Sequence, residues 1–567
     1  MKKLFYLMLS FLFLQTVAKS QNNLYIPPVL NGPVYNLTMA NGNYQFNAGI
    51  NSATKGFNGN VLGPTLIMQS GQQVHMNVHN LLGEETTVHW HGFHVEPEND
   101  GGPHTIIDPN TTWTPSFTVL EKAGTYWYHP HAHTLTAKQV LQGLAGMIIV
   151  RDAEEAALNL PRTYGVDDFP LIIQTKAIDA TGEIQFTGSE PNPDTNLMVN
   201  VTKYARLNVP QQMVRFRILN ASNQRVFNLG LSNNGVFYQI ATDGGLKNTR
   251  GTIQRLQLAP GERAEIVVPF SNYGLGATVL LKSYANELPA GTWGAAAAWI
   301  NHTNSTPSYS PNYMNGTAFT VLKFTVVAAT ANAVTTVPPA TLGTDIPIPA
   351  AQATVTRNKY LFSGGGLTVA TGSGVKISNT SSYINATNFD ETIIDDVIPI
   401  DQTEIWVLHG AADQYHPFHI HDVQFYILDR KDSLGNIIPL TSNEIGRKDV
   451  VYVGPKQTVR FVTQFKDFWG DVPYMYHCHI TVHEDMGMMK QFVVNKYFYV
   501  NKNYVGSIEN GSVLFPFKTL GKAVIFATDG TTIYFRSGGI HEEITSTPIL
   551  IQKKITLKVS NGPVIIQ

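Results

Sequence analysis

The residues best suited to chemistry lie in one short stretch, residues 477–489, which reads HCHITVHEDMGMM. It holds the only cysteine of the 567 residues, Cys478, between two histidines. Successive side chains of a strand point to opposite faces, so His477 and His479 should face one way while Cys478 faces the other. One segment can therefore serve two sites placed back to back.

The cysteine side of this stretch offers a soft set of metal ligands. It supplies a thiolate from Cys478, an imidazole from His483 and a thioether from Met488. With one more histidine from another part of the chain, these groups form the trigonal site with a weak axial thioether that copper favours for electron transfer. The two histidines on the opposite face need a second metal centre.

Histidines also cluster in other parts of the chain. The clusters are HWH at residues 89–91, HPH at 129–131, HPFHIH at 416–421 and HCHITVH at 477–483. Two histidines separated by one residue share a face of a strand, where both rings can converge on a metal ion. About one such pair is expected by chance at this histidine frequency, whereas five occur. The repetition predicts a centre of several metal ions.

The first residues, MKKLFYLMLSFLFLQTVAKSQ, are typical of a secretory signal peptide over residues 1–20. Lys2 and Lys3 come first, an apolar run follows, and the small residues Ala18 and Ser20 stand where cleavage is expected. The alternative is a buried N-terminal helix, which this order of parts disfavours. We therefore expect an exported protein that is periplasmic, extracellular or on the cell surface. There a lone cysteine is either a liability or a ligand.

The composition favours an all-β protein. Gly, Thr, Val, Ile and Tyr are plentiful and helical periodicity is scarce, as in sandwiches of many short strands. The 39 basic and 41 acidic residues nearly balance, which argues against nucleic acid as a partner. No later run is long and apolar enough to cross a bilayer, so no membrane span is expected.

Changes in composition predict the domain organisation. The histidine clusters lie in the first and third predicted domains, which suggests a site shared between them. The middle domain has no histidine before His302 and is expected to be a spacer or a wall. The predicted segments are a signal peptide at residues 1–20, a sandwich domain at 21–160, a second at 161–327, a linker rich in Ala, Thr and Pro at 328–358, a third domain at 359–495 and a β-rich tail at 496–567.

Short strands separated by turns are predicted in the tail and suggest the start of a β-solenoid. PFKTL at 516–520 and TIYFRSGG at 532–539 resemble the opening of right-handed parallel β-helix domains of the pectin-lyase type. About three coils are needed to bury a solenoid core, and the tail has room for two or three. The tail could therefore be a fragment of a β-solenoid or a small accessory module, and the sequence leaves both interpretations open.

The four histidine motifs, in this order, resemble those of the multicopper oxidases of the laccase type over residues 22–495. YQIATDGG at 238–245 and LAPGERAEIVV at 258–268 are also similar to the branch of bacterial cuprous oxidases and bilirubin oxidases. The resemblance implies three cupredoxin-like Greek-key β-sandwich domains, followed here by the β-helix-like tail. It also implies four coppers per chain, one of type 1, one of type 2 and two of type 3.

The copper ligands are implied by the same resemblance, and every ligand position of the family pattern is occupied. Cys478 is joined through its backbone to His477 and His479, which gives a short covalent route from the electron-accepting copper to the cluster. Type 1 copper would be held by His416, Cys478 and His483 with Met488 axial, type 2 by His89 and His419, one type 3 ion by His91, His129 and His479, and the other by His131, His421 and His477.

Three acidic residues stand near these motifs. Asp100 and Glu484 match positions thought to relay protons to the cluster in this family, and the plain alternative is an ordinary turn or surface acid. Asp422 departs from the glycine that many relatives carry there. Its carboxylate would either tune the cluster or make a structural hydrogen bond, and the sequence leaves both open.

Several histidines and methionines fall outside the pattern. His94 and His133 adjoin ligand motifs and could be hydrogen-bond partners of the ligands. Core packing is the better interpretation of Met486 and Met489. The other histidines outside the pattern are His75, His79, His104, His302, His409 and His541.

The first function hypothesis is a secreted laccase-like oxidase. It would take single electrons from phenols or aromatic amines through His483 and use them at the cluster to reduce dioxygen to water. The second is a cuprous oxidase serving copper tolerance, although the methionine-rich insertion usual in that branch is absent, since residues 328–401 contain no Met. The third, from another class, is a non-catalytic cupredoxin-fold surface scaffold, which the complete ligand set disfavours. A two-domain nitrite reductase does not fit three domain-sized segments.

Overall fold

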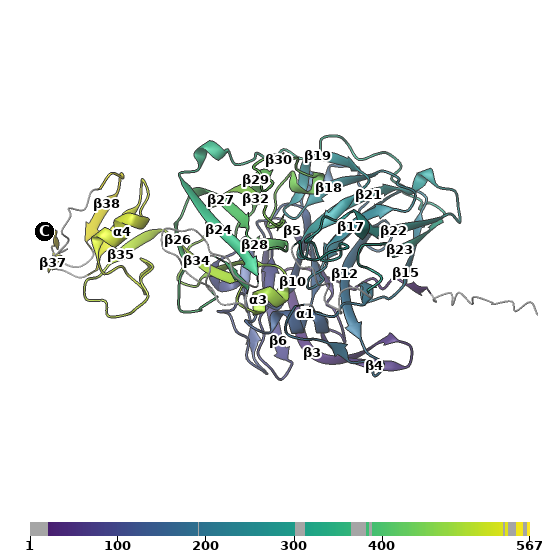
Figure 1. The fold of residues 1–567 in the computed structure, drawn as a ribbon, viewed down its shortest axis with the longest axis horizontal. Coiled ribbons are helices and arrows are strands. Elements are labelled where there is room, and N and C mark those ends of the chain that lie inside the picture. Colours follow the sequence, from purple (N-terminus) through teal and green to yellow (C-terminus); the bar gives the residue numbers. More distant parts are fainter. Residues whose placement is uncertain are drawn as a thin grey trace, which may run out of the picture.

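The computed structural model describes residues 21–190, 192–300, 312–363, 382–384, 388–536, 539–541, 551–559 and 564–566. The predicted signal peptide and His302 lie outside these residues. Within them strands dominate and the helices are short, which confirms the all-β prediction. Figure 1 shows β-sandwiches packed side by side, with the tail (yellow) as a lobe at one end.

The first sandwich is formed by two sheets of the described residues, and their facing sides make its core. Along one strand Val74, Met76 and Val78 are buried while Gln73 and His75 are exposed, the alternation expected of a sheet with one solvated face. One sheet has the order β2 (Val29–Asn31), β5 (Thr65–Gln69), β11 (Gly146–Arg151), β10 (Gly124–His129), β7 (His89–His91), and the other β4 (Ile50–Phe57), β3 (Val34–Asn47), β6 (Gln73–Leu81), β8 (Thr112–Trp113), with β9 (Ser116–Thr118) also on β6.

The middle sandwich includes the first described strand of the chain. β1 (Asn22–Asn23) pairs in parallel with β15, Asn22 opposite Ala205, although residues 21–160 are predicted as the first domain. The predicted boundaries themselves stay predictions. One sheet has the order β13 (Ile184–Gln185), β12 (Asp168–Ile178), β16 (Met213–Asn220), β21 (Arg263–Pro269), β18 (Phe237–Thr242), β19 (Gly245–Ile253), with β14 (Asn196–Val199) on β12, and the other β1, β15 (Ala205–Pro210), β23 (Ala318–Val327), β22 (Thr278–Tyr284), β17 (Phe227–Leu231), β20 (Leu256–Leu258).

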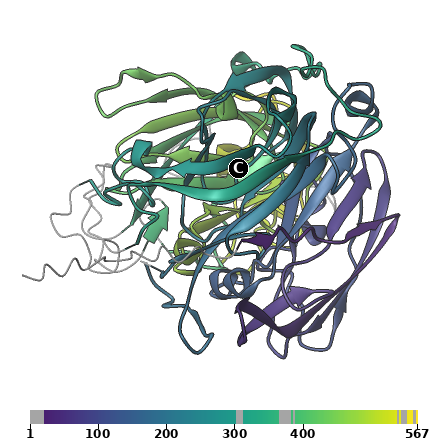
Figure 2. The ribbon, with the colours of Figure 1, turned by 90° about the vertical axis from the view of Figure 1, so that its right-hand side faces the viewer.

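The third sandwich shares a continuous apolar core with the middle one, and the purple first sandwich lies beside both in Figure 2. Phe227 and Trp293 of the middle part and Trp406 and Phe418 of the third belong to this core. Its sheets have the orders β25 (Ser382–Ile384), β24 (Val355–Ser363), β27 (Gln402–Gly410), β32 (Thr458–Phe465), β29 (Phe425–Lys431), β30 (Ile437–Ile438), and β26 (Asp396–Pro399), β34 (Met489–Asn495), β33 (Tyr474–Cys478), β28 (His416–Ile420), β31 (Val450–Val453).

Two short helices join the first and third sandwiches near the histidine motifs. Asp485, the last residue of α3 (Thr481–Asp485), accepts hydrogen bonds from the backbone N–H groups of Thr136 and Ala137 at 3.1 and 2.9 Å. It thus accepts from two of the amides that open α1 (Thr136–Gln142). None of the described helices is long and apolar enough to span a membrane. The other helices are α2 (Ala153–Ala156), α4 (Leu520–Phe526), η1 (Pro97–Asn99), η2 (Phe270–Asn272), η3 (Ala285–Glu287), η4 (Ala350–Gln352) and η5 (Ser442–Glu444).

The segment predicted as a linker is tied to all three sandwiches. Thr344 donates its backbone N–H to Glu154 of the first at 2.9 Å. The carboxylate of Asp345 forms an ion pair with Arg447 of the third sandwich, with Oδ2 and Nε 3.3 Å apart. The backbone N–H of Asp345 donates to Oδ1 of Asn248 in the middle sandwich at 2.7 Å. The connection therefore helps to fix the relative positions of the sandwiches that must share a site.

Parallel strands form the tail, as predicted for a solenoid. β35 (Tyr497–Val500), β36 (Thr532–Phe535) and β38 (Thr556–Val559) pair in parallel, and so do β37 (Gly539–His541) and β39 (Val564–Ile566). Phe498, Phe517 and Ile533 pack in its core together with Val397 and Val493 of the third sandwich. The third sandwich thus covers one end of a solenoid that is short for a core of its own.

Candidate metal centre

Strand pairing brings the histidine motifs of the first and third sandwiches to one place. In the first, β7 pairs with β10 so that His89 lies opposite His129. In the third, β28 pairs with β33 so that His419 lies opposite His477. All four side chains are buried. The site is therefore built across the interface between the two sandwiches, as the separation of the motifs predicts.

One histidine triad joins His91 and His129 of the first sandwich to His479 of the third. Nδ1 of His91 lies 3.4 Å from Nε2 of His129 and 3.3 Å from Nε2 of His479. Nδ1 of His129 faces the carbonyl oxygen of Pro130 at 2.8 Å, which fits a proton on Nδ1 and a free lone pair on Nε2. The three inward nitrogens therefore form a set of ligand atoms.

A second triad joins His131 of the first sandwich to His421 and His477 of the third. Nε2 of His131 lies 3.0 Å from Nε2 of His477 and 3.2 Å from Nε2 of His421, and the last two atoms are 3.3 Å apart. A triangle with sides near 3.2 Å has its centre about 1.8 Å from each corner, close to the ~2 Å of metal–imidazole bonds. The spacing suits a metal ion at the centre of the triangle.

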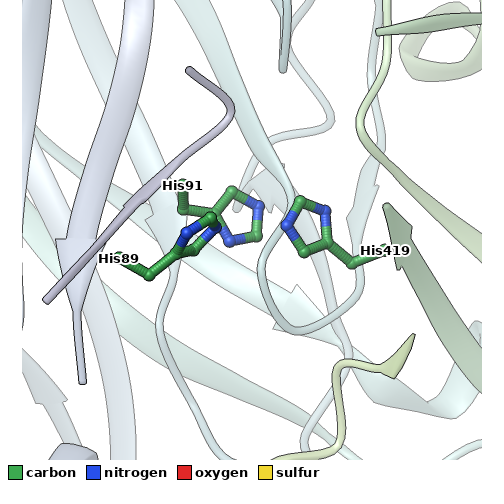
Figure 3. Close-up of side chains that lie close together, drawn as sticks. All are labelled: His89, His91 and His419. Carbon is green, nitrogen blue, oxygen red and sulfur yellow. The ribbon is translucent and has the colours of Figure 1, made fainter. Parts of the chain in front are cut away.

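His89 and His419 lie beside the triads, and Figure 3 shows their rings pointing toward one another across the interface with His91. Their Nδ1 atoms face the carbonyl oxygens of Asp100 and Asp449 at 2.9 and 2.8 Å, which places the ring protons there. Among the described residues neither Nε2 atom has a hydrogen-bond partner, although both are buried. A buried unpaired nitrogen is costly unless a cation binds it.

Cys478 faces away from both triads, toward a site in the third sandwich alone. Its Sγ lies 3.5 Å from Nδ1 of His416 and 3.7 Å from Nδ1 of His483. Met488 is buried in the same core, and its carbonyl oxygen accepts the backbone N–H of Cys478 at 3.1 Å. The one thiol of the chain thus lies with two imidazoles, as the sequence predicts.

The protonation states of these groups suit metal binding. Burial, and then the neighbouring histidines, lower the pKa of most of the ligand histidines, so the rings are neutral, which is the form that binds metal. Burial raises the pKa of the Cys478 thiol, so a thiolate there needs a cation to compensate its charge. The pKa of His479 falls to about 3, and the pKa values of His91, His129, His131, His416, His419, His421 and His477 lie well below the usual range.

Asp100 contacts two of the histidines from outside the cluster. Its Oδ2 accepts a hydrogen bond from Nδ1 of His421 at 2.8 Å, and its Oδ1 lies 3.4 Å from Nδ1 of His89. The carboxylate is buried. It is therefore placed to fix the orientation of both rings and to exchange protons with them.

Glu484 lies on the other side of the second triad. Its carboxylate oxygens lie 3.5 Å from Nδ1 of His131 and 3.3 Å from Nδ1 of His477. Burial, and then the neighbouring charge of Asp485, hold the pKa of Glu484 well above its usual range. The raised pKa favours the protonated form of this carboxyl group beside the triad.

Glu190 is a site residue that the sequence analysis does not find. One of its carboxylate oxygens accepts a hydrogen bond from Nε2 of His483 at 2.9 Å, and the other accepts from the amide of Gln414. His483 is 1% exposed and Glu190 12%, so the carboxylate covers the outer edge of the ring. Glu190 lies 293 residues before His483 in a loop of the middle sandwich, and no motif marks it.

Asp422 makes a hydrogen bond to His94, which supports the structural one of the two roles left open by the sequence. Its carboxylate lies 2.7 Å from Nδ1 of His94, whose Nε2 lies 3.1 Å from Asp467. Asp422 has a φ of +68°, in the left-handed region that favours glycine. The bond to His94 helps to offset that strain, and it links the first and third sandwiches.

The remaining histidines of the described residues lie outside the two triads and the cysteine site. His133 lies 3.4 Å from the exposed Glu391 and packs edge-on against Phe389, with ring centroids 5.0 Å apart. Met489 packs with Phe389 and Met475, which confirms core packing for this methionine. The other contacts are His75 with Ser116, His79 with Thr112, His104 with Gln491 and His409 with Asn358.

Known proteins are similar to this chain in sequence and in fold. Family models described as "Multicopper oxidase" match residues 38–155 and 367–497, the two regions that carry the motifs. Multicopper oxidase mco of Staphylococcus haemolyticus (strain JCSC1435) is 32% identical over 470 residues, which cover 81% of this chain and 88% of that protein. The chain belongs to the multicopper oxidase family. This multicopper oxidase is thus an oxidoreductase that binds copper and uses dioxygen as the electron acceptor.

Relatives of this multicopper oxidase are named for different roles. A solved structure of a laccase-like multicopper oxidase CueO from Ochrobactrum sp., described with activity towards lignin model compounds, has 30% identity and a TM-score of 0.70 and covers 83% of this chain and 100% of that chain. Cell division protein FtsP of Xenorhabdus nematophila is 29% identical over 489 residues, 84% of this chain and 93% of that protein. The names of these relatives therefore do not identify the reductant of this multicopper oxidase.

Proposed function

We propose that this protein is an exported laccase-like oxidase, which takes single electrons from phenols or aromatic amines and reduces dioxygen to water. The observation that carries the proposal is the position of Cys478 between two metal sites. Its Sγ lies near His416 and His483. Its neighbours in the chain belong to different triads, His479 to the first and His477 to the second. A covalent path of a few bonds joins the two sites.

The donor sets favour four coppers. A thiolate with two imidazoles and a weak thioether suits an electron-transfer copper, and all-imidazole sets suit the others. Bound copper would supply one-electron redox chemistry at the thiolate and the site of dioxygen reduction at the cluster. We assign type 1 copper to His416, Cys478, His483 and Met488, type 2 to His89 and His419, and the type 3 pair to His91, His129 and His479 and to His131, His421 and His477.

Electrons are proposed to enter through His483, whose outer ring nitrogen is hydrogen-bonded to Glu190. A reductant meets this carboxylate before it reaches the buried ring, since Glu190 is the more exposed of the two. The negative charge favours protonated aromatic amines and phenols that donate a hydrogen bond, and disfavours anionic reductants. Glu190 thereby contributes to the choice of substrate.

Protons are proposed to reach the cluster through Asp100 and Glu484. Asp100 exchanges a proton with Nδ1 of His421, its hydrogen-bond partner at 2.8 Å. The raised pKa of Glu484 favours a proton on its carboxyl group beside His131 and His477. A group that holds a proton at the operating pH is suited to act as a general acid.

The copper assignment is tested by the copper content and the absorption spectrum of the purified protein. About four coppers per chain with an intense blue absorption are expected, because the blue colour requires copper bound to the thiolate. Fewer than two coppers per chain after reconstitution, or four without blue absorption, would refute the assignment. The export proposal predicts a mature N-terminus near residue 21 in protein recovered from outside the cytoplasm, as read by mass spectrometry.

A cuprous oxidase is the second candidate. An acidic residue next to the buried His483 is also compatible with a metal cation as the reductant. The two candidates separate in one steady-state comparison with excess copper chelated away. A laccase-like enzyme oxidises a phenol under these conditions, whereas a cuprous oxidase consumes dioxygen with cuprous ion and acts on the phenol only after cupric ion is added.

A further inference from the structure

The middle sandwich supplies Arg263 to the cluster, so it is more than the spacer or wall expected from its lack of histidines. Arg263 opens β21, is fully buried, and forms a two-pronged ion pair with Asp449 of the third sandwich, with Nη2 to Oδ2 at 2.6 Å. Its Nε donates to the carbonyl oxygen of Thr125 in the first sandwich at 3.1 Å. The carbonyl oxygen of Asp243 accepts a hydrogen bond from Nη2 of Arg263 at 3.0 Å. One guanidinium group thus joins all three sandwiches.

Asp449 in turn contacts two of the cluster histidines. Its carboxylate Oδ1 lies 3.2 Å from Nε2 of His91, and its carbonyl oxygen lies 2.8 Å from Nδ1 of His419. The rings of these two histidines stack with centroids 3.8 Å apart. Asp449 therefore sets the orientation of one ring in the first triad and of one ring in the His89–His419 pair.

His91 is the ring whose orientation most needs such a partner. It turns Nδ1 to its triad, whereas His129 and His479 turn Nε2. A hydrogen-bond acceptor at Nε2 holds the proton there and leaves the lone pair on Nδ1. The Asp449 carboxylate is the hydrogen-bond partner of this Nε2 among the described residues, so it specifies the reversed arrangement.

The packing around Arg263 leaves little freedom for the pair to shift. A Cβ atom on Gly92, the residue after His91, would lie 2.6 Å from both Nη2 of Arg263 and Oδ2 of Asp449. A Cβ atom on Gly261 would lie 2.8 Å from the ring of His479. The backbone of the middle sandwich therefore presses directly on a cluster histidine as well.

We propose that Arg263 is a positioning residue of the copper cluster. Through the carboxylate of Asp449 it fixes the tautomer of His91, so that copper binding at the cluster depends on the middle sandwich. The buried carboxylate needs the guanidinium as its charge partner and as the fork that sets its angle. The inference rests on the copper assignment proposed above.

Copper-loaded variants test this role, with copper per chain, blue absorption and the EPR spectrum as readouts. In Arg263→Gln and Asp449→Ala we expect the blue absorption per chain to be retained while total copper falls from about four toward one. The EPR signal of the non-blue copper should be lost or changed. In Asp449→Asn an amide oxygen can still accept from His91, so at least twice as much cluster copper should remain as in Asp449→Ala.

Arg215→Gln is the matched control. Arg215 is equally buried in the middle sandwich and paired with Glu155 and Glu265, without a contact to a cluster histidine. It should lose stability and keep its copper. The proposal is overturned if Arg263→Gln keeps four coppers with an unchanged EPR spectrum, or if the control loses cluster copper to the same extent.

Two further outcomes are distinguishable. If Arg263→Gln does not fold, the comparison of Asp449→Asn with Asp449→Ala decides, and equal copper contents of these two would refute the role. If the unmodified protein lacks four coppers or blue absorption, the proposed function fails, whatever the variants do.

Discussion

His94 joins the two sandwiches that share the cluster, and His94→Gln should weaken this junction in a pH-dependent way. Burial alone lowers the pKa of His94. The charge and hydrogen bond of Asp422, then the hydrogen bond of Asp467 and the charge of Glu121, raise it from 6.5 to about 9. At about 1.36 kcal/mol per pKa unit, the rise in the pKa of His94 corresponds to about 3 kcal/mol of folding stability.

The sign follows from the two pKa values. The folded-state pKa of His94 lies above the unfolded one, so the stabilisation is complete below about pH 6.5 and is lost as the pH rises to about 9. Glu121, whose pKa is raised to about 7 by burial, titrates in the same window, but it is present in both proteins. Its effect nevertheless does not cancel, because the charge of His94 lowers the pKa of Glu121, so part of the pH dependence of the difference comes from Glu121.

The assay is thermal unfolding of the copper-free protein from pH 5.5 to 9.5, compared with His94→Gln. Domains of 150–250 residues shift by about 2–4 °C per kcal/mol. In a chain of this length, His94→Gln should therefore lower the midpoint temperature of unfolding by about 6 °C or less at pH 6 and hardly at all at pH 9.5. His133→Gln is the control, since His133 lies 3.4 Å from an exposed carboxylate and such pairs contribute about 0–1 kcal/mol. A His94→Gln deficit that stays constant across the pH range would refute the reasoning.

Three other predictions concern the metal sites and the buried charges. Cys478→Ser should abolish blue absorption and oxidase activity, as measured by spectroscopy and oxygen uptake; retention of both would exclude the thiolate as a copper ligand. Asp100→Asn should keep its copper, because the amide still contacts His421, but slow turnover roughly 10²-fold; unchanged oxygen reduction would remove the relay role. Glu265→Gln removes a carboxylate that pairs with the buried Arg215 and Arg217, and should lower the free energy of unfolding by about 3–5 kcal/mol, as measured by thermal or denaturant unfolding. A decrease of less than about 1 kcal/mol would contradict this prediction.

Strand alternation and covalent neighbours explain why much of the site could be read from the sequence. His477, Cys478 and His479 are adjacent, so the strand period alone sends the cysteine to one site and the histidines to another. The repeated H-x-H pairs likewise share strand faces wherever the strands lie. The grouping of the histidines into triads came from the resemblance to the multicopper oxidases. The structure brings the same groups together.

Contacts between distant segments could be found only in the tertiary structure. Glu190 covers His483, and Asp449 holds His91 with the help of Arg263, across hundreds of residues. Such contacts depend on how whole sandwiches pack, and single acidic or basic residues in loops and strands carry no periodic signal. The sequence by itself determined the chemistry of the ligands and the all-β fold, because these follow from residue type and local period. The tertiary structure decided which charges orient the histidines, what covers His483, and that the middle sandwich takes part in the cluster.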